Sequence, residues 1–118
     1  MQWRKLENQE TLLTIKQASE NKPVLIFKHS TRCSISSMAI DRLARSWEDE
    51  EMDHHDFYYL DLIAFRDISN QIEEMFQVPH QSPQVLIIKD GRCIYDNSHM
   101  GINYREIKLK LAEVSSRN

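Results

Sequence analysis

The stretch that decides how this chain folds reads Phe27-Lys28-His29-Ser30-Thr31-Arg32-Cys33-Ser34-Ile35-Ser36-Ser37-Met38-Ala39. It places Cys33 between an apolar run typical of a strand and a segment whose apolar residues recur with helical spacing. The start of a helix offers unpaired backbone N–H groups and the positive end of the helix dipole, and both stabilise an anionic sulfur. Cys33 is therefore the first candidate for a reactive group.

The position three residues after Cys33, where a dithiol oxidoreductase carries its second cysteine, holds Ser36. The other cysteine, Cys93, lies far along the chain, and this spacing fits neither a secreted disulfide framework nor a paired metal-ligand motif. We therefore expect reduced thiols, a site that works with a single sulfur, and a structural role for Cys93.

The length of 118 residues fits one domain, spanning 1–118, with one apolar core. The formal net charge is −3, and charges of both signs are scattered along the chain, so it lacks the basic stripe that a nucleic acid requires. The sequence contains no apolar run of membrane-spanning length and no signal-peptide pattern at its start. We expect a cytoplasmic protein whose partners include neither nucleic acid nor membrane.

The spacing of apolar residues predicts strands that alternate with helices. The strands are expected at Val24–Phe27, Asp56–Leu62, Gln84–Lys89 and Arg92–Asp96, and the helices at about 10–19, 34–51, 68–76 and from Asn103 onward. Asp90-Gly91 predicts a tight hairpin between the last two strands, and Asn103 with Glu106 resembles a capping box.

The helix after Cys33 is expected to have one apolar face. Its apolar residues are Ile35, Ala39, Leu43 and Trp47, and the charged residues on its other faces are Asp41, Arg42, Arg45 and Glu48.

This order of elements resembles the thioredoxin-like fold, an α/β fold with a central mixed four-stranded sheet, here with an extra N-terminal helix. In that family the proline before the third core strand is cis and lies against the catalytic cysteine. Pro83, preceded by Ser82, stands at the matching position. The resemblance implies that Ser82 and Pro83 shape the edge on which a substrate docks.

A nearer resemblance rests on the segment from Phe27 to Ser36 together with Gln81-Ser82-Pro83-Gln84-Val85 and Asp96-Asn97-Ser98-His99-Met100-Gly101-Ile102. The chain resembles the monothiol bacilliredoxin C, or YtxJ-type, family over nearly its whole length. Members usually carry Thr-Cys-Pro-Ile-Ser, whereas this chain has Arg32 before the cysteine and Ser34 after it.

The bacilliredoxin resemblance implies an enzyme that reduces mixed disulfides between proteins and bacillithiol through Cys33. Bacillithiol, a low-molecular-weight thiol, would then be a co-substrate rather than a bound cofactor. The implied partners are S-thiolated proteins and a reductase that recycles the enzyme.

Several polar residues around Cys33 are candidates for supporting its thiolate. Arg32 brings a permanent cation beside the sulfur or is a solvated surface residue. Ser36 donates a hydrogen bond to the thiolate or satisfies backbone amides at the helix start, where Ser34 also lies. His29, with Thr31 nearby, stabilises the thiolate or moves a proton if its ring faces the site.

Other functions compete with thiol–disulfide exchange. The chain is alternatively a redox sensor or adaptor in which Cys33 is modified without turnover. A thiol peroxidase is a weaker alternative, because the proline and threonine that peroxiredoxins place before their cysteine are absent. The cluster Met52-Asp53-His54-His55-Asp56 is read as a solvated loop rather than a metal site, because its ligand spacing is irregular.

Overall fold

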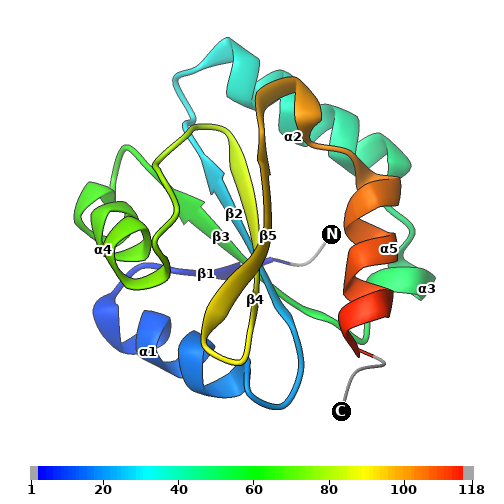
Figure 1. Ribbon diagram of the computed structural model, residues 1–118. Helices are drawn as coiled ribbons and strands as arrows, with labels where there is room; N and C mark the ends of the chain where they lie inside the picture. The colour runs from blue at the N-terminus through cyan, green and yellow to red at the C-terminus, as the bar shows by residue number, and fades with distance from the viewer. Residues whose placement is uncertain (1–2, 116–118) are drawn as a thin grey trace.

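The computed structural model describes residues 3–115 as helices around one five-stranded sheet (Figure 1). In chain order the elements are β1 (Arg4–Lys5), α1 (Gln9–Ala18), β2 (Val24–His29), α2 (Ser34–Ser46), α3 (Asp49–Met52), β3 (Asp56–Asp61), α4 (Arg66–Phe76), β4 (Gln84–Lys89), β5 (Arg92–Ser98), the 3-10 helix η1 (His99–Gly101) and α5 (Tyr104–Ser115). The strand order is β1-β3-β2-β4-β5. β3 runs parallel to both β1 and β2, whereas β4 is antiparallel to β2 and to β5. The expected α/β class and mixed sheet are confirmed.

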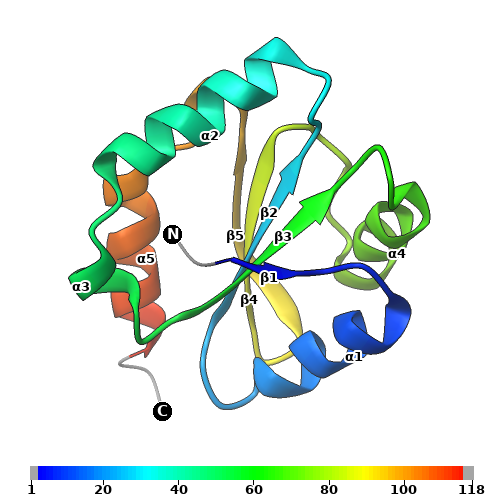
Figure 2. The same ribbon diagram turned by 180° about the vertical axis from the view of Figure 1, so that it is seen from behind.

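Helices cover both faces of the sheet, with α1 and α4 on one face and α2, α3 and α5 on the other (Figures 1 and 2). All residues of β2 are buried, as predicted for a strand covered on both sides. Val24 and Ile26 pack toward α1 and α4, while Leu25 and Phe27 pack toward α2 and α5. None of the helices in the described part of the chain is long and apolar enough to cross a membrane.

The sheet has one strand more than predicted. β1 is only two residues long, and its side chains are exposed, so it carries no apolar alternation that a sequence pattern could reveal. It pairs with β3 at the sheet edge, and the pairing continues where Leu6 N donates to Tyr59 O at 2.9 Å.

The helix expected over 34–51 is divided in the structure. α2 ends at Ser46, because Trp47 adopts an extended ψ of 126° and leaves the helix. The Trp47 ring packs 5.3 Å from Trp3 and 5.1 Å from Phe57, measured between ring centroids. Trp47 therefore reaches the core because the helix ends just before it, and α3 begins shortly afterwards.

The hairpin and the last helix start as predicted. Asp90 and Gly91 have φ values of 55° and 74°, the positive values that a tight two-residue turn requires. β5 continues to Ser98, beyond its predicted end. In the predicted capping box, Asn103 Oδ1 accepts a hydrogen bond from Glu106 N at 3.0 Å. The Glu106 carboxylate is engaged elsewhere and accepts from Tyr95 OH at 2.6 Å.

Candidate active site

Cys33 lies between the end of β2 and the start of α2, as the sequence predicts. It is the N-cap residue of α2, and its thiol is free and half-buried. Its sulfur accepts no capping hydrogen bond, and the first turn of α2 contains no acidic residue. The positive end of the helix dipole therefore faces no competing negative charge in that turn, an environment that favours an anionic sulfur.

Ser36 and His29 form a buried polar pair next to Cys33. Ser36 Oγ accepts a hydrogen bond from Ser30 N at 3.1 Å and lies 2.5 Å from Nδ1 of His29. The His29 ring therefore faces α2, which the sequence left open, and its side chain is only 6% exposed. Ser36 thus ties the end of β2 to the first turn of α2, and neither of these hydrogen bonds caps a helix amide.

The remaining residues predicted to support the thiolate lie at the surface. Thr31, Arg32 and Ser34 are all exposed. Arg32 makes no ion pair with any residue that the structure describes, so its guanidinium remains available to a ligand beside Cys33.

Ser82 and Pro83 lie at the same end of the sheet as Cys33. The Ser82–Pro83 peptide bond is cis, and Pro83 is buried. The next residue, Gln84, pairs with Lys28 near the end of β2, which places Pro83 beside the segment that leads to Cys33. Figure 1 shows the start of α2 and the loop before β4 at this common edge.

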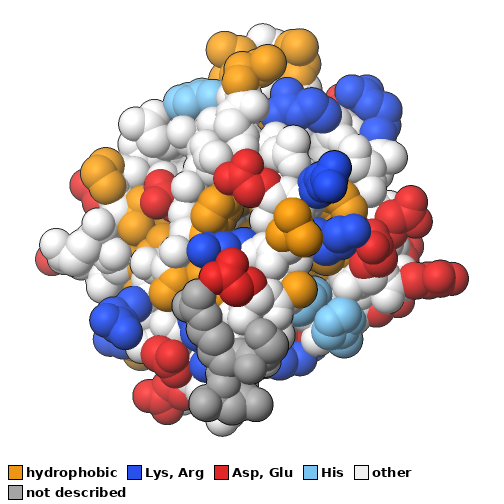
Figure 3. All heavy atoms as spheres, turned by 45° about the vertical axis from the view of Figure 1, so that its right-hand side comes forward, with side chains coloured by type: hydrophobic (Ala, Val, Ile, Leu, Met, Phe, Trp, Pro, Cys, Tyr) orange, Lys and Arg blue, Asp and Glu red, His pale blue; other side chains and the backbone are white. Residues whose placement is uncertain are grey.

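An apolar groove of about 300 Å³ begins near Cys33. Its lining residues come from α2 and η1 and are Ile35, Met38, Ala39, Arg42, His99 and Met100. Exposed hydrophobic side chains gather at the top of the molecule in Figure 3, the end at which α2 begins in Figure 1. Met100 is 81% exposed and Met38 is 66% exposed, so large apolar side chains lie at the surface along this groove.

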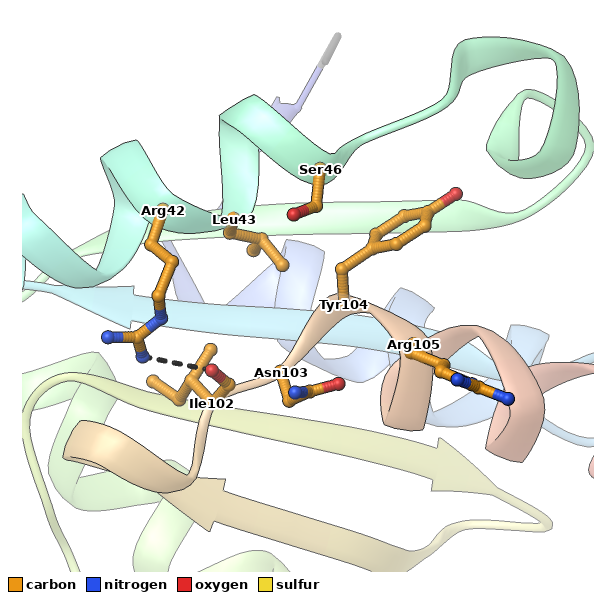
Figure 4. Close-up of a pocket in the computed structure, with 7 residues that line it drawn as sticks. All are labelled: Arg42, Leu43, Ser46, Ile102, Asn103, Tyr104 and Arg105. Atoms are coloured by element: carbon orange, nitrogen blue, oxygen red, sulfur yellow. Dashed lines mark hydrogen bonds between the residues drawn. The ribbon is translucent and has the colours of Figure 1, made fainter.

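Arg42, which the helical pattern places on a charged face of α2, fixes the wall of this groove. One guanidinium nitrogen donates to Ile102 O at 2.9 Å and to His99 O at 3.3 Å. On its other side Arg42 borders a second pocket of about 280 Å³ between α2 and α5, where its side chain and that of Arg105 point in opposite directions (Figure 4). This second pocket therefore does not gather two cations around one anionic ligand.

Comparison with known protein families identifies the relatives of this chain. The model of the monothiol bacilliredoxin BrxC family matches residues 4–107, a span that includes Cys33, Ser36 and Pro83. The chain belongs to this family.

Solved structures share the fold of this chain. An oxidoreductase with a thioredoxin fold is 33% identical and superposes with a TM-score of 0.74, covering 93% of this chain and 92% of that one. Thioredoxin from Malassezia sympodialis is 15% identical with a TM-score of 0.73, covering 98% and 92% of the two chains. A chain from a complex of ferredoxin:thioredoxin reductase with thioredoxin f2 is 15% identical with a TM-score of 0.69, covering 98% and 96%.

The fold is therefore thioredoxin-like, as the sequence indicated, and this bacilliredoxin family member is a thiol–disulfide oxidoreductase. The likeness to the two structures at 15% identity concerns the fold alone.

Cys93 lies at the opposite end of the sheet from Cys33. It pairs with Ile88, which in turn pairs with Val24 at the beginning of β2. The length of β2 separates this end from Cys33, roughly 15 Å at the usual rise of a strand. Cys93 is half-buried, and burial raises the pKa of its thiol to about 11, which disfavours the reactive thiolate.

Lys28 is a buried residue of β2 that the sequence analysis did not single out. Its side chain is fully buried, and Nζ has no hydrogen-bond partner among the described residues. Burial lowers the pKa of its ammonium to about 8, while Glu73 opposes this shift. The sequence shows only one lysine at the end of an apolar run and does not tell which face of the sheet its side chain occupies. The burial of Lys28 became apparent only from the strand register in the structure.

Proposed function

We propose that this enzyme removes bacillithiol from S-thiolated proteins by monothiol exchange at Cys33. The observation that carries the proposal is the pairing of Cys33 at the start of α2 with a buried hydroxyl, Ser36, in place of a resolving thiol, in a chain of the bacilliredoxin family. No local disulfide can form at such a motif, so the sulfur must exchange with an outside thiol.

In the proposed reaction the Cys33 thiolate attacks the bacillithiol sulfur of the mixed disulfide. A bond forms between this sulfur and Cys33 Sγ as the original S–S bond breaks, and the protein leaves as a thiolate that takes up a proton. A second small thiol, or a reductase, then attacks the Cys33 adduct and restores the free thiol. The electron pair ends in the released protein thiol, and the small thiol or the reductase that supplied it leaves as the bacillithiol disulfide or in its oxidised form.

The surroundings of Cys33 suit the two sides of such a mixed disulfide. Arg32 is exposed beside the cysteine and matches a carboxylate of the small thiol, because its planar fork pairs with that group. Ser34 begins α2, and Thr31 precedes the cysteine in the exposed turn. We assign the protein side of the disulfide to the edge formed by Ser82 and Pro83, beside which the apolar groove opens.

We place this activity in the cytoplasm, where a reducing thiol pool and a recycling reductase keep cysteines free. In the proposed mechanism the enzyme needs no bound metal or organic cofactor, since the sulfur of Cys33 supplies the chemistry.

The test offers the enzyme mixed disulfides of bacillithiol, glutathione, coenzyme A and cysteine and identifies the adduct by intact mass. We expect a bacillithiol adduct that is lost in Cys33→Ala and kept in the matched control Cys93→Ala. No adduct with any of the four compounds would refute exchange at Cys33, and a preference for another thiol would refute the bacillithiol assignment.

Turnover separates the enzyme from a redox sensor that is merely modified. With a bacillithiolated protein in excess and free bacillithiol present, we expect many equivalents of protein thiol to be released per enzyme. Release of a single equivalent would instead support the sensor.

A further inference from the structure

Arg42 connects α2 to the segment that follows β5. One nitrogen of its guanidinium donates to His99 O at 3.3 Å and to Ile102 O at 2.9 Å, and Figure 4 draws the second of these bonds. A second nitrogen lies 3.9 Å from the sulfur of Met100. Among the residues that the structure describes, no carboxylate forms an ion pair with Arg42. The charge of Arg42 is therefore directed at η1 and at the residue after it.

His99 carries this connection on to the edge formed by Ser82 and Pro83. Its N–H donates to Pro83 O at 3.1 Å, while its carbonyl accepts from Arg42. Its φ is 52°, a left-handed value that is uncommon for a residue other than glycine and that indicates a constraint from the surroundings. A continuous chain of contacts thus runs from α2, the helix that follows Cys33, through His99 to Pro83.

The contact with β5 fixes η1 from its other side. A Cβ atom added at Gly101 would collide with the side chain of Asn97, so these two residues leave no space between η1 and β5. η1 is therefore held by β5 on one side and by Arg42 on the other. This arrangement preforms the groove between η1 and α2 before any partner binds.

The apolar groove is continuous with the reactive end of the molecule. Ile35, which lines the groove, lies two residues after Cys33. His99, which lines it from η1, is bonded to Pro83. We expect a protein whose modified cysteine meets Cys33 to bring the neighbouring residues of its own chain to this groove. The volume of about 300 Å³ and the exposed methionines suit a large apolar side chain such as leucine, because methionine adapts its shape to what it binds.

We propose that Arg42 is a positioning residue for the protein substrate. It holds η1 at the distance from α2 at which the groove receives an apolar side chain next to the modified cysteine. The contacts of Arg42 lie on η1 and Ile102, so it acts on docking rather than on the reactivity of the Cys33 sulfur. The inference rests on the proposed function in taking a mixed disulfide of a protein as the substrate.

Loss of the Arg42 guanidinium would let η1 leave the arrangement that binds the substrate. The apparent affinity of a site falls with the fraction of molecules that are competent to bind, so the change appears in KM and leaves kcat in place. Arg42→Met keeps the aliphatic part of the side chain and removes the bonds to both carbonyl groups. For a substrate that uses the groove we expect KM to rise about tenfold, as for the loss of one hydrogen bond to a charged group.

The experiment uses two synthetic peptides with one bacillithiolated cysteine each, flanked by leucines in one peptide and by serines in the other. Release of the peptide thiol is measured with free bacillithiol in excess. We expect Arg42→Met to raise KM for the leucine peptide and to change KM for the serine peptide little, since serine side chains gain nothing from the groove. Arg45→Met, the matched control at an exposed position of α2, should keep both KM values of the wild-type protein.

Two outcomes with Arg42→Met would overturn the proposal. One is an unchanged KM for the leucine peptide. The other is an equal loss with both peptides, because Arg42 would then act on the fold or on Cys33.

Two substitutions at His99 test the same chain of contacts without removing Arg42. Valine disfavours the left-handed backbone conformation, whereas asparagine tolerates it, and both variants lose the imidazole. We expect His99→Val to raise KM for the leucine peptide by more than His99→Asn does. Equal effects would contradict the proposal, because the backbone conformation of His99 would then have no part in docking.

The wild-type protein separates this inference from the proposed function. We expect it to release thiol from both peptides, with the lower KM for the leucine peptide. Release from neither peptide would refute the proposed function, and the positioning role of Arg42 would fall with it. Release from both peptides with the same KM would leave exchange at Cys33 intact and refute only the use of the groove.

Discussion

At the level of single residues, Ser36 does more than stand in the place of a second cysteine. Its buried hydroxyl joins Ser30 before the cysteine to His29 at the end of β2. The sequence singled out Cys33, Ser36 and His29 as candidates, because their types and their place between a strand and a helix follow from local patterns. It could not predict which way the His29 ring faces, because that depends on the twist and end of β2.

The variant Ser36→Cys tests the local geometry. We expect mild oxidant to close a disulfide between residues 33 and 36, because the N-cap side chain and the third helical residue lie on the same turn. Intact mass would show the loss of two hydrogens, and the product would resist iodoacetamide until it is reduced. In the matched variant Ser37→Cys, whose side chain lies on another face of α2, we expect no such closure. A Ser36→Cys protein that stays reduced would show that Cys33 is not positioned at the helix start.

At the level of elements, the prediction worked where one helix or strand carries a clear period and failed where tertiary packing overrides it. β2 and α4 follow from their apolar patterns. The end of α2 does not, because Trp47 continues the four-residue spacing and yet leaves the helix to pack against Trp3. Arg42 shows the same limit, since its position on a polar face gives no sign of the carbonyl groups that it binds on η1 and after it.

Lys28 gives a prediction for β2. Its pKa falls from 10.5 to about 8 on folding, so the folded state holds a costly ammonium at pH 7 that the unfolded chain keeps in water. We expect Lys28→Met, which keeps the shape of the side chain, to raise the free energy of unfolding at pH 7 by about 2 kcal/mol.

The gain in stability expected for Lys28→Met should depend on pH. Between pH 8 and 10.5 the folded protein has lost the Lys28 proton and the unfolded chain still holds it, so the wild-type protein gains stability as pH rises. The advantage of Lys28→Met should therefore shrink across this range in urea unfolding. Lys89→Met, which removes a lysine that pairs with Asp90, is the matched control and should bring no gain at pH 7. Equal or lower stability of Lys28→Met at pH 7 would mean that the buried ammonium has a stabilising partner.

At the level of the whole molecule, the two cysteines lie at opposite ends of the sheet. Cys33 and Pro83 both lie at the end of the sheet where β2 ends, while Cys93 lies near the hairpin at the other end. The thioredoxin-like resemblance implied the position of Pro83 near Cys33, and the order of the elements agrees with it, because a strand, a crossover helix and an antiparallel hairpin place their ends in a fixed way. The sequence could not show the short strand β1, whose two exposed residues become a strand only by pairing with β3.

The stability of the whole fold should fall in mild acid because of His55, which the sequence analysis read as part of a solvated loop. Its side chain is only 8% exposed, and burial, with the nearby His54 and Lys22, lowers its pKa from 6.5 to about 4. The folded protein therefore keeps His55 neutral between these values while the unfolded chain takes up a proton. The stability is fully present above pH 6.5 and is lost as the pH falls toward 4, by about 2 kcal/mol.

Urea unfolding at neutral pH and near pH 5 tests the role of His55 in this loss. We expect His55→Gln to be less sensitive to acid than the wild-type protein, because a neutral amide takes up no proton in either state. The exposed neighbour provides the matched control, and His54→Gln should retain most of the acid sensitivity, since burial is the largest cause of the His55 shift. If His55→Gln loses stability in acid as steeply as the wild-type protein, then His55 is already accessible to protons in the folded state, and the acid sensitivity must come from other groups.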